Sequence, residues 1–245
     1  TGETAGVRAP HRHRHSLGTC HLGGRGHAEA AIAAALRAQG PWGELPWEER
    51  AAVFLRAADL LAGPWRARIN AAEIDAACEM ADFFRWNVYF LRRLMDTEQP
   101  VSPRETWNRV DLRPLEGFVL AVSPFNFTSI AANLPCAPAL MGNVVLWKPA
   151  QTAVLSNWLV MRLLHEAGLP DGVINFVPGH AEEIGAAALQ QARLRKGRDR
   201  LGGGARQLKT VCLNSQYMVV NGSRAVLFEL GQSLQEITCA CWALH

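Results

Sequence analysis

The spacing of apolar residues predicts a run of helices between residues 27 and 116. Apolar positions recur every three or four residues from Ala28 onward, and this is the period of a helix with one buried face. Gly40-Pro41 should end the first helix, Pro46 should open a second, and Gly63-Pro64 should end that one. The buried face of the second helix is expected to consist of Val53, Ala57, Leu60 and Leu61.

A third helix is expected from Asn70 to about Leu94. Asn70 and Glu73 have the spacing of a capping box, in which two side chains each accept a backbone N–H at the start of a helix. An aromatic cluster follows, and packing in the core is favoured over a role as a ligand-binding wall. Its members are Phe83, Phe84, Trp86, Tyr89 and Phe90.

From Gly117 the pattern changes to short runs that are apolar throughout, separated by helix-length segments. The runs GFVLAVS, VVLW and VINFV predict three strands, with one helix from Thr128 to Met141 and another from Thr152 to Ala167. Strands that are apolar on both faces and joined by helices indicate a parallel sheet with both faces covered and right-handed crossovers. The fold class is therefore α/β, with N-terminal helices followed by a parallel β-α-β-α-β unit.

Two of these strands stop abruptly at polar residues beside a proline. The first ends in Ser123-Pro124-Phe125-Asn126, and the second ends in Trp147-Lys148-Pro149, followed by Gln151. In parallel α/β sheets, ligands bind beyond the carboxyl ends of the strands, so these stops are the candidate rim of a binding crevice. The residues alone leave two alternatives open: Asn126 as a helix cap after the strand, and Lys148 as an ordinary surface lysine.

The two ends of the chain show less regular patterns. Residues 1–26 are expected to form an irregular or extended arm, in which a solvated basic surface is favoured over a metal site because no Cys or carboxylate joins His11, His13 and His15. Residues 183–245 form an atypical tail and a candidate for disorder. Within it, residues 193–207 indicate a basic, Gly-rich loop, and residues 217–231 a hairpin that turns at Asn221-Gly222.

Composition narrows the class of protein. A chain of 245 residues, 49% hydrophobic and 19% charged, can build one large domain or two small ones. The net charge of +3 is spread along the chain and gives no nucleic-acid footprint. The apolar stretches are broken before a membrane-spanning length, and the start has no signal-peptide core. Six cysteines at no disulfide-scaffold spacing favour a reducing compartment over secretion.

Long runs of this sequence resemble the aldehyde dehydrogenase superfamily. The runs PLEGFVLAVSPFNFTSIAANLPCAPALMGNVVLWKPAQT and LLHEAGLPDGVINFVPG carry that resemblance, which extends more loosely from about residue 15 to about residue 180. The runs AEIDAACEMADFFRWNVYF and QPVSPRETWNRVDLRPLEGF are similar to its L-glutamate γ-semialdehyde (Δ1-pyrroline-5-carboxylate) dehydrogenases. The resemblance implies that residues 27–116 are the N-terminal helical part and residues 117–182 the first half of a Rossmann-like NAD-binding domain, left incomplete here.

The resemblance also implies a chemistry, in which a thiolate adds to the aldehyde, hydride passes to NAD, and the thioester is hydrolysed. Asn126 matches the asparagine whose side-chain NH2 helps form the oxyanion hole, and Pro124 and Phe125 would fix the loop that aims it. A preorganised donor of this kind typically contributes roughly a hundredfold or more in rate. Lys148 matches the lysine that hydrogen-bonds the adenosine ribose of NAD.

Four further assignments depend on the same resemblance. Gln151 stands where relatives often carry an acidic partner for that ribose, so NAD rather than NADP is implied by the family and not by this side chain. Ser123 and Pro149 are expected to shape the cofactor cleft through their backbones. Glu73 lies in a run that is near the substrate tunnel in relatives, and this role stands beside its capping-box role.

The sequence departs from the family after the third strand. No FTGS turn for the pyrophosphate follows, and neither the run with the general-base Glu nor the run with the nucleophilic Cys is intact. FELGQS at residues 228–233 echoes the first run, but Glu229 lies only ten positions before Cys239. Because this spacing is far shorter than in the family, the echo is interpreted as accidental, as is a nucleophilic role for Cys239 or Cys241.

Two functions remain in competition. The first is NAD-dependent oxidation of L-glutamate γ-semialdehyde to L-glutamate in proline degradation, with a small aldehyde as partner and no metal, nucleic acid or membrane. The alternative is a catalytically inactive fragment, with an open sheet edge, that could at most bind a nucleotide or a full-length subunit of the family's homo-oligomer. A basic interaction module built from residues 193–207 is disfavoured. The expected location is the mitochondrial matrix in a eukaryote or the cytoplasm in a bacterium.

Overall fold

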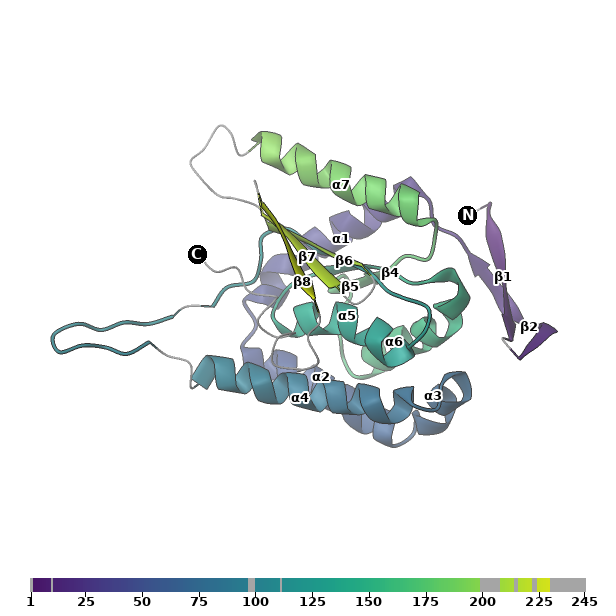
Figure 1. The fold of residues 1–245 in the computed structure, drawn as a ribbon, viewed down its shortest axis with the longest axis horizontal. Coiled ribbons are helices and arrows are strands. Elements are labelled where there is room, and N and C mark those ends of the chain that lie inside the picture. The colour runs from purple at the N-terminus through teal and green to yellow at the C-terminus, as the bar shows by residue number, and fades with distance from the viewer. Residues whose placement is uncertain are drawn as a thin grey trace.

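The computed structural model describes residues 2–9, 11–96, 100–110, 112–198, 208–213, 216–221 and 224–229, with side chains up to residue 191. Figure 1 shows the order of the elements along the chain. They are β1 (Thr4–Ala9), β2 (Arg12–His21), α1 (Arg25–Gly43), α2 (Trp47–Ala62), α3 (Arg66–Ala72), α4 (Ala76–Asp96), β3 (Val119–Val122), α5 (Thr128–Leu140), β4 (Val145–Lys148), η1 (Gln151–Ala153), α6 (Val154–Glu166), β5 (Ile174–Phe176), α7 (Ala181–Arg198), β6 (Leu208–Leu213), β7 (Gln216–Asn221) and β8 (Arg224–Glu229).

The N-terminal arm is extended over most of its length, the second of the two predicted alternatives, because residues 4–21 form a hairpin. Strands β1 and β2 pair antiparallel from Thr4↔His21 to Ala9↔Arg12, with two register shifts. Pairing satisfies backbone groups that an isolated extended arm would leave to water. His13 and His15 lie exposed on β2. Within the described part of the chain, no group of three or more His, Cys, Asp or Glu side chains is placed to hold a metal ion.

The first two helices follow the apolar pattern, with one difference at the end of α1. The predicted stop at Gly40-Pro41 is wrong, because α1 continues through both residues to Gly43. Trp42 in this last turn is buried, and its Nε1 donates a hydrogen bond of 2.8 Å to the carbonyl oxygen of Ala139. That anchor holds the turn helical although Pro41 contributes no N–H. The boundaries of α2 at Pro46 and Gly63 are confirmed.

The predicted capping box at Asn70 is wrong. Asn70 lies inside the short helix α3, and Glu73 is the C-terminal cap residue of that helix, with its N–H bonded to the oxygen of Ile69 at 2.8 Å. Helix α4 begins only at Ala76. Asn70 and Glu73 have the spacing of a box, but a box would require a helix that begins at residue 71, and α4 begins five residues later.

The prediction that the aromatic cluster packs in the core is correct for Phe84 and wrong for Trp86 and Tyr89. Phe84 is buried against Phe54, with ring centroids 5.9 Å apart. Trp86 and Tyr89 are 46% and 48% exposed, and pack edge to face on the outer side of α4. The cluster covers several faces of one helix, so it cannot all turn toward one core.

The predicted β-α-β-α-β unit is confirmed. Strands β3, β4 and β5 are parallel neighbours, with α5 and α6 as the crossovers. In Figure 1, α1 and α7 cover one face of the sheet, while α5 and α6 cover the other and are backed by α2 and α4. Two hydrophobic cores correspond to these two faces, the larger one containing Trp147 and Phe54 and the smaller one Ile32 and Leu146.

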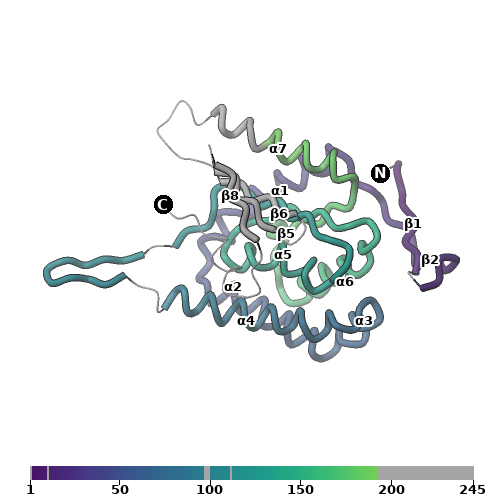
Figure 2. The backbone as a smooth tube through the Cα atoms, in the orientation of Figure 1, coloured from purple at the N-terminus to yellow at the C-terminus, as the bar shows by residue number. Residues whose placement is uncertain are grey.

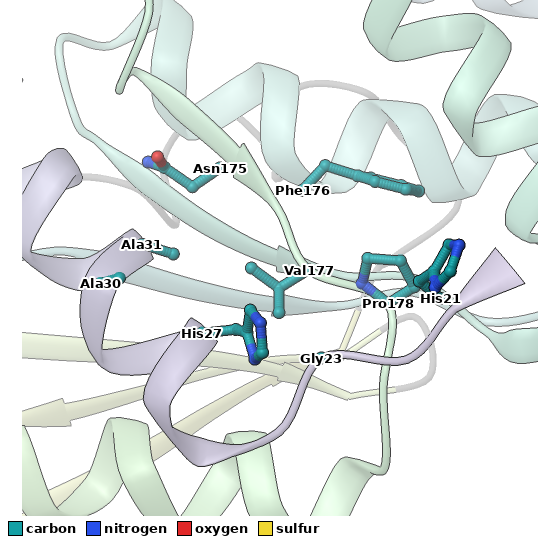
Figure 3. A pocket seen from close by; sticks show the side chains of 9 residues that line it. All are labelled: His21, Gly23, His27, Ala30, Ala31, Asn175, Phe176, Val177 and Pro178. Atoms are coloured by element: carbon teal, nitrogen blue, oxygen red, sulfur yellow. The ribbon is translucent and has the colours of Figure 1, made fainter. Parts of the chain in front are cut away.

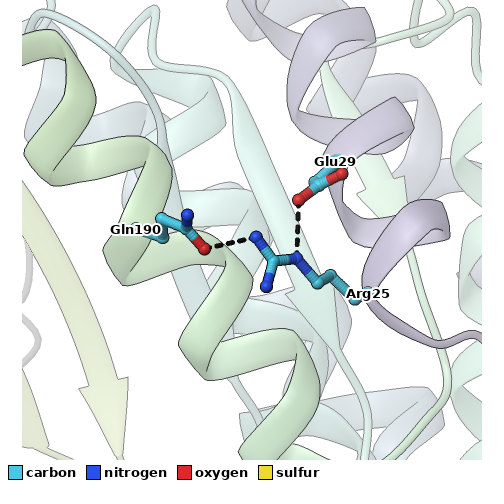
Figure 4. A network of polar contacts seen from close by, with 3 residues as sticks. All are labelled: Arg25, Glu29 and Gln190. Atoms are coloured by element: carbon cyan, nitrogen blue, oxygen red, sulfur yellow. Dashed lines mark hydrogen bonds and ion pairs between the residues drawn. The ribbon is translucent and has the colours of Figure 1, made fainter.

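Helices α1 and α7 are joined by a polar contact as well as by the smaller core. Arg25 forms an ion pair of 2.8 Å with Glu29 on α1, and its Nη2 donates to the side-chain oxygen of Gln190 on α7 (Figure 4). Helix α7 extends to Arg198. The predicted loop at residues 193–207 is therefore helical at its start, and its part beyond residue 198 lies outside the described residues.

The sheet continues beyond β3. Strand β6 pairs parallel with β3, at Leu120↔Val211 and Ala121↔Cys212. Strands β7 and β8 follow antiparallel and give the order β5-β4-β3-β6-β7-β8. The hairpin predicted at Asn221-Gly222 is confirmed by the pairing Asn221↔Arg224. Backbone groups along β3 are thus bonded on both sides.

A segment between α4 and β3 projects away from the body of the protein (Figure 2). Its described residues include Val101 and Trp107, which are 87% and 80% exposed.

None of the helices in the described ranges combines the length and the apolar character needed to cross a membrane.

Candidate functional site

The two predicted stops lie side by side at one edge of the sheet. Val122, the last residue of β3, pairs with Lys148, the last residue of β4. Beyond this pair the Ser123 N–H donates to the carbonyl oxygen of Lys148 at 3.1 Å. The indole Nε1 of the buried Trp147 donates to Ser123 Oγ at 3.0 Å. Ser123 is therefore held at the rim by both backbone and side chain.

The loop from Ser123 to α5 is buried at its base and exposed at its tip. Ser123 and Pro124 are buried, whereas Phe125 is 73% exposed and Asn126 is exposed beside it. The cap residue of α5 is Phe127, so Asn126 does not take the capping role left open as its alternative. Its amide is presented to solvent above the strand ends, where it can donate to a bound group.

Lys148 is not an ordinary surface lysine. The residue is only 8% exposed, and burial lowers the pKa of its ammonium group. No ion pair to Lys148 exists among the described residues, and no carboxylate contributes to its pKa. A desolvated ammonium at a strand end gains free energy from an acceptor supplied by a ligand, such as a hydroxyl or an anion. Next to it Pro149 is buried, and Gln151 is exposed at the start of η1.

The side chain of Glu73 reaches the start of α5. One of its carboxylate oxygens accepts the backbone N–H of Thr128. A second acidic residue, Glu79 in the first turn of α4, accepts the hydroxyl hydrogen of Ser129. The sequence pattern did not single out Glu79, because its partner lies 50 residues away.

His180 is a further residue at the strand ends that the pattern missed. It follows β5, the third parallel strand, and its Nε2 lies 2.9 Å from a carboxylate oxygen of Glu3. The hydrogen bond to Glu3, and then the negative charge of Glu3, raise the pKa of His180, while the charge of Lys148 lowers it. Lys148 and His180 are therefore within electrostatic reach of each other.

A separate open pocket of about 420 Å³ lies between the start of α1 and β5 (Figure 3). None of the predicted site residues lines it. Its walls are His21, Gly23, His27, Ala30, Ala31, Asn175, Phe176, Val177 and Pro178.

The cysteines do not complete a catalytic site within the part of the chain whose side chains are described. Cys136 lies in α5 and is 1% exposed, and burial strongly raises its pKa. A thiol in that state is a poor source of thiolate. Cys20 lies on β2, and Cys78 is exposed at the start of α4, next to Glu79. Cys239, Cys241 and residues 230–233 of the FELGQS echo lie outside the described residues.

Comparison with known proteins identifies what this architecture resembles. The family described as "Aldehyde dehydrogenase family" matches residues 1–196, which is longer at both ends than the predicted stretch of about 15 to about 180. The "Delta-1-pyrroline-5-carboxylate dehydrogenase" of Agaricus bisporus is 50% identical over 190 residues, covering 73% of this chain and 35% of its own length. The "Delta-1-pyrroline-5-carboxylate dehydrogenase, mitochondrial" of Emericella nidulans is 52% identical over 169 residues, covering 64% of this chain and 29% of its own.

Solved structures give the same picture. The crystal structure of the Delta-pyrroline-5-carboxylate dehydrogenase from Mycobacterium tuberculosis bound with NAD superimposes with a TM-score of 0.74 and 52% identity, covering 77% of this chain and 37% of that one. The chain thus spans about a third of the length of the curated relatives it matches.

Proposed function

The chain belongs to the aldehyde dehydrogenase family, and from that premise we propose that it forms part of an enzyme that oxidises L-glutamate γ-semialdehyde to L-glutamate with NAD, in proline degradation. The names of the relatives support the substrate, since Δ1-pyrroline-5-carboxylate is the cyclised form of this semialdehyde. The NAD-bound Mycobacterium structure supports the cofactor. In this proposal the chain supplies the N-terminal helices, residues 27–116, and the first half of the cofactor domain, residues 117–182.

The single observation that carries the proposal is the pair of strand ends at Ser123 and Lys148. They bring together a buried ammonium, with no ion pair among the described residues, and a hydrogen-bonded turn where a parallel sheet binds ligands. These residues fit the adenosine side of NAD, with Lys148 and Gln151 at the ribose hydroxyls and Ser123, Pro124, Phe125 and Pro149 as walls. NAD, when bound, supplies the hydride acceptor for oxidation of the aldehyde.

Asn126 takes the role of oxyanion donor in this proposal. Its exposed amide stands on a loop whose base is buried and whose two ends are hydrogen-bonded to other elements. A donor held in that way needs little reorganisation when negative charge develops on the aldehyde oxygen.

A second function, an inactive nucleotide-binding piece, is favoured by one observation. Cys136, the cysteine nearest to Asn126 in the sequence, is buried in α5 and is therefore a poor nucleophile. In that case the chain would bind NAD, or a full-length subunit of a homo-oligomer, without turnover. The mitochondrial label of the Emericella relative supports a matrix location if the source is eukaryotic, and a bacterial source would place the chain in the cytoplasm.

The proposal is tested by titrating NAD against the protein and its Lys148→Ala variant by calorimetry. We expect the unaltered protein to bind and the variant to bind about ten- to a hundredfold more weakly, because a hydrogen bond from a charged donor contributes about 1.5–3 kcal/mol. Arg37→Ala, which removes an exposed cation on α1, is the matched control and should bind like the unaltered protein. Equal affinity in Lys148→Ala would remove Lys148 from the site, and no binding by the unaltered protein would contradict the proposal.

A further inference from the structure

The loop that carries Asn126 leads into a helix that lacks a cap of its own. Phe127, the cap residue of α5, has an extended backbone and no side-chain hydrogen bond to the helix. Helices usually begin with Ser, Thr, Asp or Asn, whose side chains satisfy the first free N–H groups. Here a remote residue supplies that acceptor, because the Thr128 N–H donates to Glu73, which lies 55 residues earlier in the chain.

A second carboxylate acts on the next residue of the same helix. The hydroxyl of Ser129 donates to Glu79, which comes from the first turn of α4, whereas Glu73 comes from the end of α3. Thr128 is 5% exposed and Ser129 is fully buried, so water is a poor substitute for either acceptor. Both negative charges also lie at the positive end of the α5 dipole.

The two helices are tied again further along their contact. Asn87 of α4 donates a buried hydrogen bond of 2.7 Å to Asn133 of α5. Helix α5 is therefore registered against α4 at its start and in its middle. The loop at residues 123–127 ends where α5 begins. A contact that fixes the first residues of α5 therefore also fixes the direction of the loop.

The opposite end of the loop is fixed by different residues. Ser123 is held by the carbonyl of Lys148 and by the indole of Trp147. Four residues span from Ser123 to Thr128, and the exposed tip of Phe125 and Asn126 lies between these two anchors. If the contacts at Thr128 were lost, Phe125 and Asn126 would be free to rotate about Ser123.

We propose that Glu73 and Glu79 are positioning residues that hold the start of α5 and thereby aim the loop with Asn126 at the crevice. They act through Thr128 and Ser129 rather than by touching the ligand. This inference rests on the proposed function in taking the loop at residues 123–127 as part of the NAD and oxyanion site.

The test uses the full chain with Ala and Gln variants of each carboxylate. Glu73→Ala and Glu79→Ala remove the acceptor, whereas Glu73→Gln and Glu79→Gln keep an oxygen at the same reach and should restore its effect. Glu49→Ala is the matched control, since Glu49 is an exposed carboxylate in the first turn of α2. Circular dichroism checks that each variant is folded.

Two quantities are measured, amide hydrogen exchange at residues 125–129 and the dissociation constant of NAD. We expect about fivefold faster exchange in each Ala variant, the effect of losing a typical helix cap, with a comparable weakening of NAD binding. The Gln variants and Glu49→Ala should match the unaltered protein.

Unchanged exchange in the folded Ala variants would overturn the inference. Faster exchange with unchanged NAD affinity would also overturn it, because the carboxylates would then only stabilise the helix. If the unaltered protein binds no NAD, the proposed function fails separately, and the exchange data still decide whether the carboxylates hold the loop.

Discussion

At the scale of single residues, two glycines show how differently one added methyl group would act. A Cβ on Gly179 would lie 2.1 Å from the carbonyl oxygen of Gly23 and 2.8 Å from Ile184 Cδ1, where the segment before α1 passes over the end of β5. Gly185, six residues later in α7, has open space around it. The contact at Gly179 is backbone to backbone, so it cannot be relieved by a side-chain rotation.

We therefore expect Gly179→Ala to lower the free energy of unfolding by about 1–3 kcal/mol, as overpacking does. Gly185→Ala, the matched control, should raise it by about 0.5–1 kcal/mol because alanine favours the helix. Urea unfolding followed by circular dichroism measures both. Equal stabilities of the two variants would show that Gly23 and Gly179 do not approach as closely as described.

Arg50 is the buried residue on which several chain segments converge. It is 5% exposed, and burial lowers its pKa. Its guanidinium donates to the carbonyl oxygens of Leu140 at 3.1 Å and Gly43 at 3.4 Å, and also to Leu45. The ends of α1 and α5 thus share one donor.

We expect Arg50→Met to lower the free energy of unfolding by about 2–4 kcal/mol, because buried carbonyl groups lose their partner. Arg50→Lys should recover only part of the loss, since an ammonium lacks the fork of the guanidinium. Thermal and urea unfolding provide the measurement, with Arg37→Met on the exposed face of α1 as control. A stable Arg50→Met protein would mean that these carbonyls find water instead.

At the scale of elements, the N-terminal hairpin is attached to the start of α7 by one titrating pair. His180 precedes α7 and Glu3 precedes β1, with 2.9 Å between Nε2 and Oε1. The neighbouring Leu22 N–H donates to the Glu3 carbonyl at 3.0 Å, so the pair also touches the end of β2. Glu3 raises the pKa of His180 above its ordinary value.

This attachment should weaken as pH rises. A folded-state pKa above the unfolded one means that the stabilisation is fully present below the unfolded pKa of about 6.5 and is lost as pH rises through the folded value. We expect NMR titration to show a lower His180 pKa in Glu3→Gln than in the unaltered protein. Amide hydrogen exchange in β1 should become faster as the pH rises above the His180 pKa in the unaltered protein, but not in Glu3→Gln. His13→Gln, exposed on β2, is the control. An unchanged His180 titration in Glu3→Gln would contradict the pairing.

At the scale of the whole molecule, the sheet brings the ends of β3 and β4 together, with Ser123 against Lys148 and Asn126 three residues further along the loop. The cysteines with described side chains lie on β2, on α4 and in the interior at α5. Oxidation of an aldehyde by this route needs a thiolate beside the oxyanion donor.

We expect the 245-residue chain to produce no NADH from L-glutamate γ-semialdehyde, even if it binds NAD. The assay follows NADH absorbance with the purified chain, with Cys239→Ser and Cys241→Ser alongside. Turnover that either serine variant abolishes would contradict the expectation and make the C-terminal segment part of an active site.

The parts of the fold that could be predicted are those determined by the residue pattern within a short stretch of sequence. Apolar runs bounded by Gly or Pro place β3, β4 and β5, and the segments between them have the length and period of α5 and α6. The stops at Ser123 and Lys148 follow, because parallel strands must end at the same edge. Burial of Cys136 follows from its place on a helix that is apolar all round.

The tertiary structure alone decided features whose partners are distant in sequence. The Asn70–Glu73 spacing predicts a local cap, yet Glu73 accepts from Thr128, and Glu79 finds Ser129 only after α4 packs on α5. Trp42 keeps the end of α1 helical through Ala139, and β6 pairs with β3 although about 85 residues separate them. Local periodicity determines which elements form, because it is set by backbone geometry. Which polar groups meet depends on how these elements pack, because a buried donor takes whichever acceptor packing brings to it.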